Sequence, residues 1–261
     1  MSSRAEAEPA AEAEDLTRTF GATTALDGVS FTVHRGEIFG LLGPNGAGKT
    51  TAMRILLTLL RPTAGRARVA GLDVAASARQ VRAVTGWVPQ DRTVDPLLTT
   101  QENVTFMAGM YHLSAKEGRC RAAELLRQAG LDEHRGKLAR DLSGGMRRKL
   151  EVAMSLVNVP AVLFLDEPTL GLDISARRAL WDYVRQIRET GSTIVLTTHY
   201  LDEADRLCDR VAIIDRGRIR ATGTPAGLKE QYRAATLDDV FLAATGQDLA
   251  GQPAVDQLVS S

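Results

Sequence analysis

Short apolar runs without polar alternation recur along the chain, at 38–42, 161–165 and 193–197. Such runs predict strands that are covered on both faces, as in a parallel sheet flanked by helices. The other predicted strands are shorter or more polar, and they lie at 16–20, 29–33, 66–70, 85–88, 211–214 and 218–221. The last two flank the turn at 215–217, so they predict a hairpin late in the chain.

Between Leu97 and Pro160 the pattern changes from strand to helix, with candidate helices near 101–111, 116–129 and 144–157. Outside this stretch, helical spacing or position after a strand predicts helices at 50–60 and 175–190. Strands and helices alternate on both sides of the helical stretch. We therefore expect an α/β core into which a helical subdomain, about 97–160, is inserted.

The two ends of the chain differ from its centre. Residues 1–15 are rich in Ala, Glu and Pro and carry no large apolar residue after Met1, so we expect a disordered tail. A last helix begins at Thr236, whose hydroxyl can cap it together with Asp239. Its apolar positions share one face, which favours docking on the parent domain over partner binding. The expected divisions are a tail at 1–15, a main domain at 16–223 and a C-terminal helical extension at 224–261 that becomes loose from Gly246.

Composition narrows the class of protein. The 261 residues carry 32 Lys and Arg against 32 Asp and Glu, so the net charge is zero and we expect no nucleic-acid partner. Cys120 and Cys208 lie far apart without metal-ligand spacing, which favours reduced packing residues. The longest uncharged runs, 103–115 and 154–165, are shorter than the roughly 18 apolar residues that span a bilayer. No signal-peptide pattern precedes them, so we expect any work at a membrane to need a partner.

A glycine-rich segment follows the first buried strand and comes before a predicted helix. It consists of Gly43, Pro44, Asn45, Gly46, Ala47, Gly48, Lys49, Thr50 and Thr51. The spacing G-x-x-x-x-G-K-T lets several backbone N–H groups converge on phosphate oxygens, and the following helix directs its positive dipole end at the anion. Lys49 would neutralise the β- and γ-phosphates, and the Thr50 hydroxyl would bind Mg²⁺. Phe20, which precedes this loop, suits adenine stacking and a core position at a strand end equally well.

Two adjacent carboxylates, Asp166 and Glu167, follow the buried run 161–165. The carboxyl end of a buried strand beside a phosphate loop is where Mg²⁺ is held, and Asp166 suits that role. Glu167 can direct its carboxylate at a water in line with the γ-phosphorus, as a general base or as a group that polarises the water. We favour this interpretation over simple surface charges.

A second predicted anion site opens the helix near 144–157. Ser143 can cap this helix, and Gly144 and Gly145 leave its first N–H groups bare. The site lies about a hundred residues from the first phosphate loop in sequence, so the two do not readily grip one nucleotide within one subunit. A head-to-tail dimer, in which the second site of each subunit closes the nucleotide pocket of the other, resolves this.

Taken together and in order, these motifs resemble the nucleotide-binding subunit of an ABC transporter over about residues 16–223. They are the phosphate loop 43–51, Gln90, Ser143-Gly144-Gly145, Asp166-Glu167, Gly171-Leu172-Asp173 and His199. The resemblance implies a P-loop NTPase core with an antiparallel β subdomain and an inserted α-helical subdomain. It also implies that Gln90 links the γ-phosphate and Mg²⁺ to a membrane subunit, that Asp173 communicates across the dimer, and that His199 holds the γ-phosphate and the attacking water. Without the resemblance, Gln90 would be interpreted as a turn residue, Asp173 as a helix cap and His199 as a histidine at the end of a strand.

Two features resemble one branch of this family more narrowly. Met146 stands where the general pattern has Gln, and 147–153 continue Arg-Arg-Lys-Leu-Glu-Val-Ala. With the segment 237–246, this is similar to the ATPases of the daunorubicin-resistance type, which are partners of ABC-2 membrane proteins. The basic run 147–149 predicts a solvated helix face, and we assign it no site.

The leading hypothesis is an ATPase with ATP and Mg²⁺ as ligands. It would work as a homodimer on the cytoplasmic side of the membrane and drive an ABC-2 type permease to export a drug or other amphipathic compound. A rival is a soluble ABC protein that acts as a nucleotide-gated binding module in translation or DNA repair. The neutral charge and the single cassette argue against it. Export of a lipid or polysaccharide is not separable from drug export by sequence.

Overall fold

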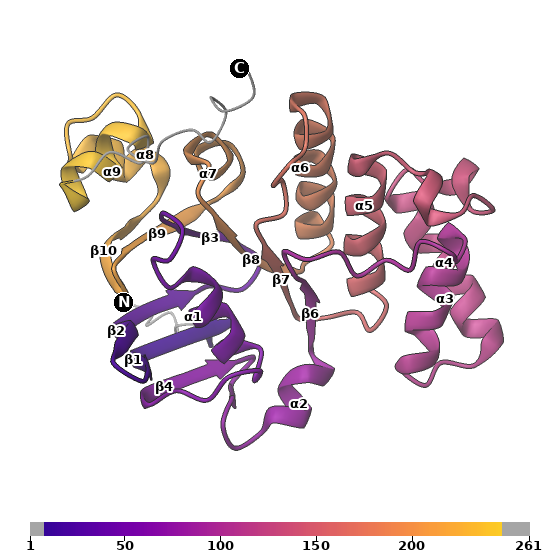
Figure 1. The fold of residues 1–261 in the computed structure, drawn as a ribbon, viewed down its shortest axis with the longest axis horizontal. Helices are drawn as coiled ribbons and strands as arrows, with labels where there is room; N and C mark the ends of the chain where they lie inside the picture. Colours follow the sequence, from indigo (N-terminus) through magenta and orange to yellow (C-terminus); the bar gives the residue numbers. More distant parts are fainter. Residues whose placement is uncertain (1–7, 247–261) are drawn as a thin grey trace, which may run out of the picture.

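The computed structural model describes residues 8–246, which form two sheets and the helices around them (Figure 1). The smaller sheet is antiparallel, in the order β2-β1-β4-β5. The larger sheet has the order β10-β9-β3-β8-β7-β6 and is parallel from β9 to β6, with β10 antiparallel at its edge. The predicted α/β fold with an antiparallel β subdomain is confirmed.

The strands lie close to the predicted apolar runs. Their bounds are β1 Ala11–Phe20, β2 Thr23–Val33, β3 Ile38–Leu42, β4 Ala64–Val69, β5 Leu72–Asp73, β6 Thr85–Val88, β7 Val162–Asp166, β8 Thr193–Thr198, β9 Arg210–Asp215 and β10 Arg218–Gly223. In β3, Ile38 and Leu42 belong to one hydrophobic cluster, and Phe39 and Leu41 belong to the other. The central sheet is thus covered on both faces, as its unbroken apolar runs predict.

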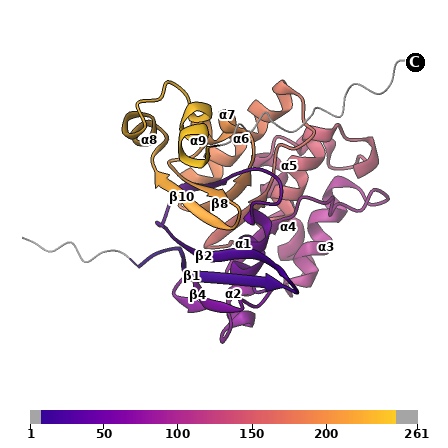
Figure 2. The ribbon, with the colours of Figure 1, turned by 60° about the vertical axis from the view of Figure 1, so that its left-hand side comes forward.

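The helices divide between the two faces of the central sheet. Their bounds are α1 Lys49–Leu56, α2 Ala78–Ala83, α3 Thr100–Met110, α4 Ala115–Gln128, α5 Gly144–Ser155, α6 Ile174–Glu189, α7 Leu201–Leu207, α8 Pro225–Gln231 and α9 Leu237–Thr245. The face with α5, α6 and α7 lies opposite the one covered by α1 and the antiparallel sheet. Helices α3 and α4 lie beyond α5 in Figure 1, and both contact α5. The three helices form the inserted helical part, which also stays together in the turned view of Figure 2. The pattern had not predicted α2, α7 and α8.

The prediction of a disordered tail through residue 15 is wrong for its last part. Residues 11–15 belong to β1, which pairs on both sides, with β2 and with β4. Ala11 and Ala13 are buried, whereas Glu12 forms an ion pair with Arg68. The alternation of Ala and Glu has the period of a strand, and small residues suffice because two neighbouring strands satisfy the backbone. Residues 1–7 and 247–261, where the remaining tail predictions fall, lie outside the described residues.

The last helix docks on the domain, as its apolar face predicts. Leu237, Val240 and Phe241 of α9 are buried in contact with α7, α8 and β10. The predicted cap is present, because the Thr236 hydroxyl accepts from the Asp239 amide and the Asp239 carboxylate accepts from the Thr236 amide. None of the helices within residues 8–246 has the length and hydrophobicity to cross a membrane.

We predict that the cluster between the sheets carries a large share of the stability. Phe164 in β7 is fully buried there, whereas Phe106 on α3 is 62% exposed. Phe164→Ala removes a whole ring from a packed site, so the free energy of unfolding should fall by about 3–5 kcal/mol. Phe106→Ala, the control, should change it by at most about 0.5 kcal/mol. Urea unfolding of both variants tests this, and equal losses would contradict the assignment of the core.

Candidate nucleotide-binding site

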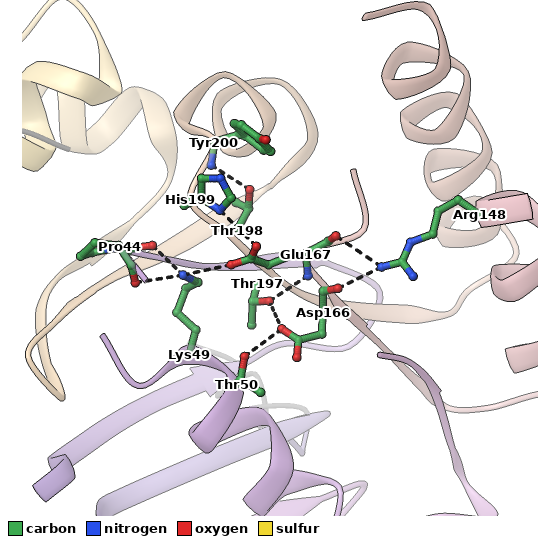
Figure 3. A network of polar contacts seen from close by, with 11 residues as sticks. Pro44, Lys49, Thr50, Arg148, Asp166, Glu167, Thr197, Thr198, His199 and Tyr200 are labelled. Atoms are coloured by element: carbon green, nitrogen blue, oxygen red, sulfur yellow. Dashed lines mark hydrogen bonds and ion pairs between the residues drawn. The ribbon is translucent and has the colours of Figure 1, made fainter. Parts of the chain in front are cut away.

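The carboxyl ends of three parallel strands bring together the predicted phosphate loop, the two carboxylates and His199. Leu42 of β3 pairs with Thr198 of β8, and Asp166 of β7 pairs with Thr197 of β8. The segments that follow these strands therefore begin at one edge of the sheet, where ligands bind in folds of this type. Figure 3 shows the Lys49, Glu167 and His199 side chains turned toward one another there.

The glycines of the loop are required by close contacts and by backbone conformation. A Cβ atom at Gly43 would lie 2.1 Å from the Ile214 carbonyl oxygen. At Gly48 it would lie 2.6 Å from the Ala25 oxygen, and the φ of 107° is also one that glycine tolerates best. At Gly46, with a φ of 79°, the space is open. The chain itself thus fills the space at Gly43 and Gly48, whereas Gly46 matches the expected room for a ligand.

Lys49 opens α1 and is buried, with only 5% of its surface exposed. Its Nζ donates to the carbonyl oxygens of Gly43 at 2.7 Å and Pro44 at 3.1 Å, and it lies 3.3 Å from Glu167 Oε1. Burial lowers the pKa of Lys49 below its ordinary value, and the carboxylates of Glu167 and Asp166 oppose this shift. The ammonium is thus held at the mouth of the loop, where it can meet a phosphate.

The residues around Asp166 suit Mg²⁺. The Thr50 hydroxyl donates to Asp166 Oδ1 at 3.2 Å, so two of the three expected oxygen ligands adjoin, and the third, Gln90, stays a prediction. Within residues 8–246 no cluster of three or more His, Cys, Asp and Glu could hold a metal. One carboxylate with one hydroxyl matches the way Mg²⁺ binds, since this ion takes few protein ligands and completes its shell with water and substrate phosphates. The donor set fits an ion that arrives with a nucleotide.

Glu167 carries a strained backbone and a carboxylate between two nitrogen groups. Its φ of 45° lies in the left-handed region, and its amide donates to Thr197 Oγ1 at 3.0 Å and to the Thr197 carbonyl oxygen at 3.2 Å. Its Oε2 lies 3.2 Å from Nδ1 of His199. Burial raises the pKa of Glu167, but His199 and Lys49 together outweigh it and leave the pKa below its ordinary value. The side chain is therefore held as a carboxylate, the form that a general base needs.

The second predicted anion site lies apart from the first. Ser143 caps α5 and accepts from the Met146 amide at 3.2 Å, as expected. Ser143, Gly144 and Gly145 line a cavity of about 540 Å³ together with Asp173, and among the described residues none from 43–51 lines it. This separation is the arrangement that the dimer hypothesis requires.

Phe20 and Gln90 are both exposed. Phe20 is 43% exposed, with the Arg18 guanidinium 4.5 Å from its ring centre, so it is not a core aromatic. Gln90 follows β6 by two residues. Adenine stacking by Phe20 and phosphate sensing by Gln90 stay predictions.

Asp173 is the N-cap of α6. Its carboxylate accepts from the Ala176 amide at 2.9 Å and from the Ser175 hydroxyl at 2.8 Å, and these bonds lower its pKa. Its expected role in communication across a dimer stays a prediction.

Two residues of the site were missed in the sequence. Thr197 donates to Asp166 Oδ1 at 2.5 Å, and its place opposite Asp166 on the neighbouring strand follows only from the strand order. Arg148, predicted to be solvated, is buried and donates to backbone carbonyls behind Glu167. Arg148 and Val152 have helical spacing on α5 and are both buried, but residues 150–155 are all buried, so the pattern marks no single face that would have singled out Arg148.

The fold and these contacts define the class of protein as a P-loop nucleotide-binding cassette. A profile described as ABC transporter matches residues 26–170. The chain is 49% identical to the daunorubicin resistance ATP-binding protein DrrA2 of Streptomyces coeruleorubidus over 84% of this chain and 68% of the relative. It is 46% identical to the Nod factor export ATP-binding protein I of Ralstonia nicotianae, over 83% of this chain and 68% of the relative.

A solved ATP-binding subunit of an ABC transporter superposes with a TM-score of 0.79 at 32% identity, covering 90% of this chain and 99% of that one. The chain therefore belongs to the ABC transporter family, and within it to the ATP-binding subunits. Binding and hydrolysis of ATP are the general chemistry of this family.

We predict that Thr197 orients Asp166 toward a bound Mg²⁺. Thr197→Val keeps the shape but loses the hydroxyl, so the Mg²⁺ concentration for half-maximal ATP hydrolysis should rise about 10- to 100-fold. Thr193→Val is the matched control, because the Thr193 hydroxyl accepts from the Gly36 amide at 3.0 Å at the opposite end of the same strand. A Mg²⁺ titration of hydrolysis checks both variants. An unchanged Mg²⁺ requirement in Thr197→Val would refute this role.

Proposed function

We propose that this chain is the ATPase subunit of an exporter that uses closure of a dimer around two Mg·ATP to drive a separate membrane subunit. The observation that supports this most is the Glu167 carboxylate held 3.3 Å from Lys49 and 3.2 Å from His199. Glu167 follows Asp166 directly in the chain, and the backbone amide of Glu167 is held by a hydrogen bond to the Thr197 hydroxyl. A base, two phosphate-binding groups and a magnesium ligand thus share one edge of the sheet.

In the proposed mechanism, Lys49 and His199 exchange one anionic partner, the Glu167 carboxylate, for another, the γ-phosphate of ATP. Lys49 and His199 both contact Glu167, so a γ-phosphate that engages them replaces the carboxylate and releases it toward the attacking water. Glu167 then accepts a proton from that water, while Lys49 and the amides of the loop neutralise the charge that moves onto the phosphate oxygens. Thr50 and Asp166 would hold Mg²⁺, which when bound stabilises negative charge on the phosphates.

A dimer completes the site. The helix end at Ser143, Gly144 and Gly145 opens into a cavity separate from loop 43–51. A second copy placed head to tail supplies this helix end as a further phosphate-binding group. Because only the closed dimer has both groups on one nucleotide, ATP binding favours closure. Moving such an equilibrium from mostly open to mostly closed takes about 5.5 kcal/mol of differential affinity.

The cargo belongs to the membrane subunit, which we propose to be of the ABC-2 type. The names of the relatives mention daunorubicin resistance and Nod factor export, so we propose a drug or other amphipathic compound as the exported molecule. The chain would then lie peripherally on the cytoplasmic side of the cell membrane. Its C-terminal helix α9 is docked on the domain, against α7, α8 and β10.

We predict that Glu167→Gln separates binding from hydrolysis. The amide keeps the size of the side chain but cannot accept the proton, so hydrolysis should fall by at least about 100-fold while ATP binding persists. Lys49→Ala should lose binding itself, because it removes the buried ammonium. Equilibrium dialysis with ATP and a phosphate-release assay measure the two properties. Full hydrolysis in both variants would show that the mechanism is wrong.

We predict that Glu167→Gln, trapped with Mg·ATP, captures a membrane subunit. Tagged protein would be recovered from detergent-solubilised native cells with and without Mg·ATP. An integral membrane protein with about six spans is the expected companion. Ribosomal proteins or DNA factors without a membrane protein would transfer the chain to the soluble class of ABC proteins and leave only the ATPase chemistry. Lys49→Ala serves as the control for nucleotide dependence.

A further inference from the structure

Arg148 is one of the most fully engaged side chains near the site. It lies on α5 five residues after the cap Ser143, and 9% of its side chain is exposed. All three guanidinium nitrogens donate hydrogen bonds. The acceptors are the carbonyl oxygens of Pro168 at 2.8 Å, Pro89 at 2.9 Å, Asp166 at 3.0 Å and Glu167 at 3.3 Å, and Glu151 Oε2 at 2.7 Å. Burial of an arginine is costly unless its donors are paired, and these bonds pair every guanidinium nitrogen and fix the position of the side chain.

Three of these acceptors are the consecutive carbonyls of residues 166–168. They surround Glu167, whose left-handed backbone conformation is unfavourable for a residue with a side chain and persists only when its surroundings fix it. Thr197 holds the amide side of this turn. Arg148 holds the carbonyl side, as Figure 3 shows. We therefore infer that the orientation of the Glu167 carboxylate depends on Arg148, which bonds to the backbone of Glu167 and not to its carboxylate.

The same ion pair holds the segment that contains Gln90. Pro89, on one side of Gln90, accepts from Arg148. Thr93, on the other side, donates its amide to Glu151 Oε1 at 3.2 Å. Glu151 is itself buried and lies one helical turn after Arg148. Through Arg148 and Glu151, helix α5 is thus hydrogen-bonded to the turn at Glu167 and to the residues on both sides of Gln90.

We propose that Arg148, paired with Glu151, is a positioning residue that mechanically connects the Ser143 helix end to Glu167 and to the Gln90 segment. The proposal rests on the proposed ATPase function and deepens it. In the head-to-tail dimer, the Ser143 end of α5 binds the nucleotide of the partner subunit, while Glu167 acts on the nucleotide of its own. A shift of α5 on closure moves Arg148, and with it the general base, so the two sites of the dimer are coupled.

The test uses the full chain with Arg148→Gln and Arg148→Lys. Arg121→Gln is the matched control, because Arg121 also pairs with a glutamate three residues later and donates to the Leu156 carbonyl at 2.7 Å. For Arg148→Gln, kcat for ATP hydrolysis should fall about 10- to 100-fold, while the Kd for Mg·ADP from calorimetry stays within about 3-fold. Arg148→Lys should recover part of kcat, since an ammonium restores some donors but not the planar fork. Arg121→Gln should keep kcat within about 2-fold.

Arg148→Gln leaves Glu151 buried without its partner and can misfold. The double variant Arg148→Met with Glu151→Met removes both charges, a change that often preserves stability, and it should show the same loss of kcat with Tm near that of the unaltered chain. Hydrogen exchange gives a readout independent of hydrolysis, and amides at 89–93 and 166–170 should exchange faster in the double variant. A folded double variant with unaltered kcat and exchange overturns the proposal, as does an equal loss in Arg121→Gln. If the unaltered chain shows no hydrolysis that Lys49→Ala abolishes, the proposed function fails, and exchange alone decides on Arg148.

Discussion

Parallel pairing of β3, β8 and β7 is the constraint on which the rest of the site depends. The register places Leu42 beside Thr198 and Asp166 beside Thr197. Because parallel strands end on the same side, the phosphate loop, the carboxylates and His199 must emerge together. The apolar side chains of these strands enter both hydrophobic clusters. The energy that buries the sheet therefore also fixes the relative position of the chemical groups.

The charged side chains at this edge of the sheet are neutralised by ion pairs with one another and not by solvent. The Lys49 ammonium is buried, and Glu167, buried beside it, is its ion-pair partner. A buried charge without a partner is costly, so the Lys49 ammonium and the Glu167 carboxylate are found paired. The same reasoning applies to Arg148 and Glu151, which neutralise each other behind the turn at Glu167. Both buried ion pairs thus involve Glu167, the residue with the left-handed backbone. Lys49 contacts its side chain, and Arg148 contacts its backbone carbonyl.

Most elements could be predicted because each has a local cause. The cap of α9 needs only Thr236 and Asp239, and β7 is a run of apolar residues whose limit is visible in the sequence. The errors have equally local causes. Ala11 and Ala13 seemed too small to order a strand, yet β2 and β4 satisfy the backbone on both sides. The short helices α2, α7 and α8 have few turns in which a period can show.

The sequence by itself determined the phosphate loop, the pair Asp166-Glu167 and the capped helix after Ser143, because the chemistry of each needs particular residue types at fixed spacing. Tertiary structure alone decided that the Thr197 hydroxyl donates to Asp166 and that the Arg148 guanidinium donates to the Glu167 carbonyl. It also decided that Phe20 stays exposed. These facts depend on which distant segments become neighbours, and strand order and helix packing set that. A basic residue on a helix reveals nothing of the carbonyls it will meet until the helix has been placed.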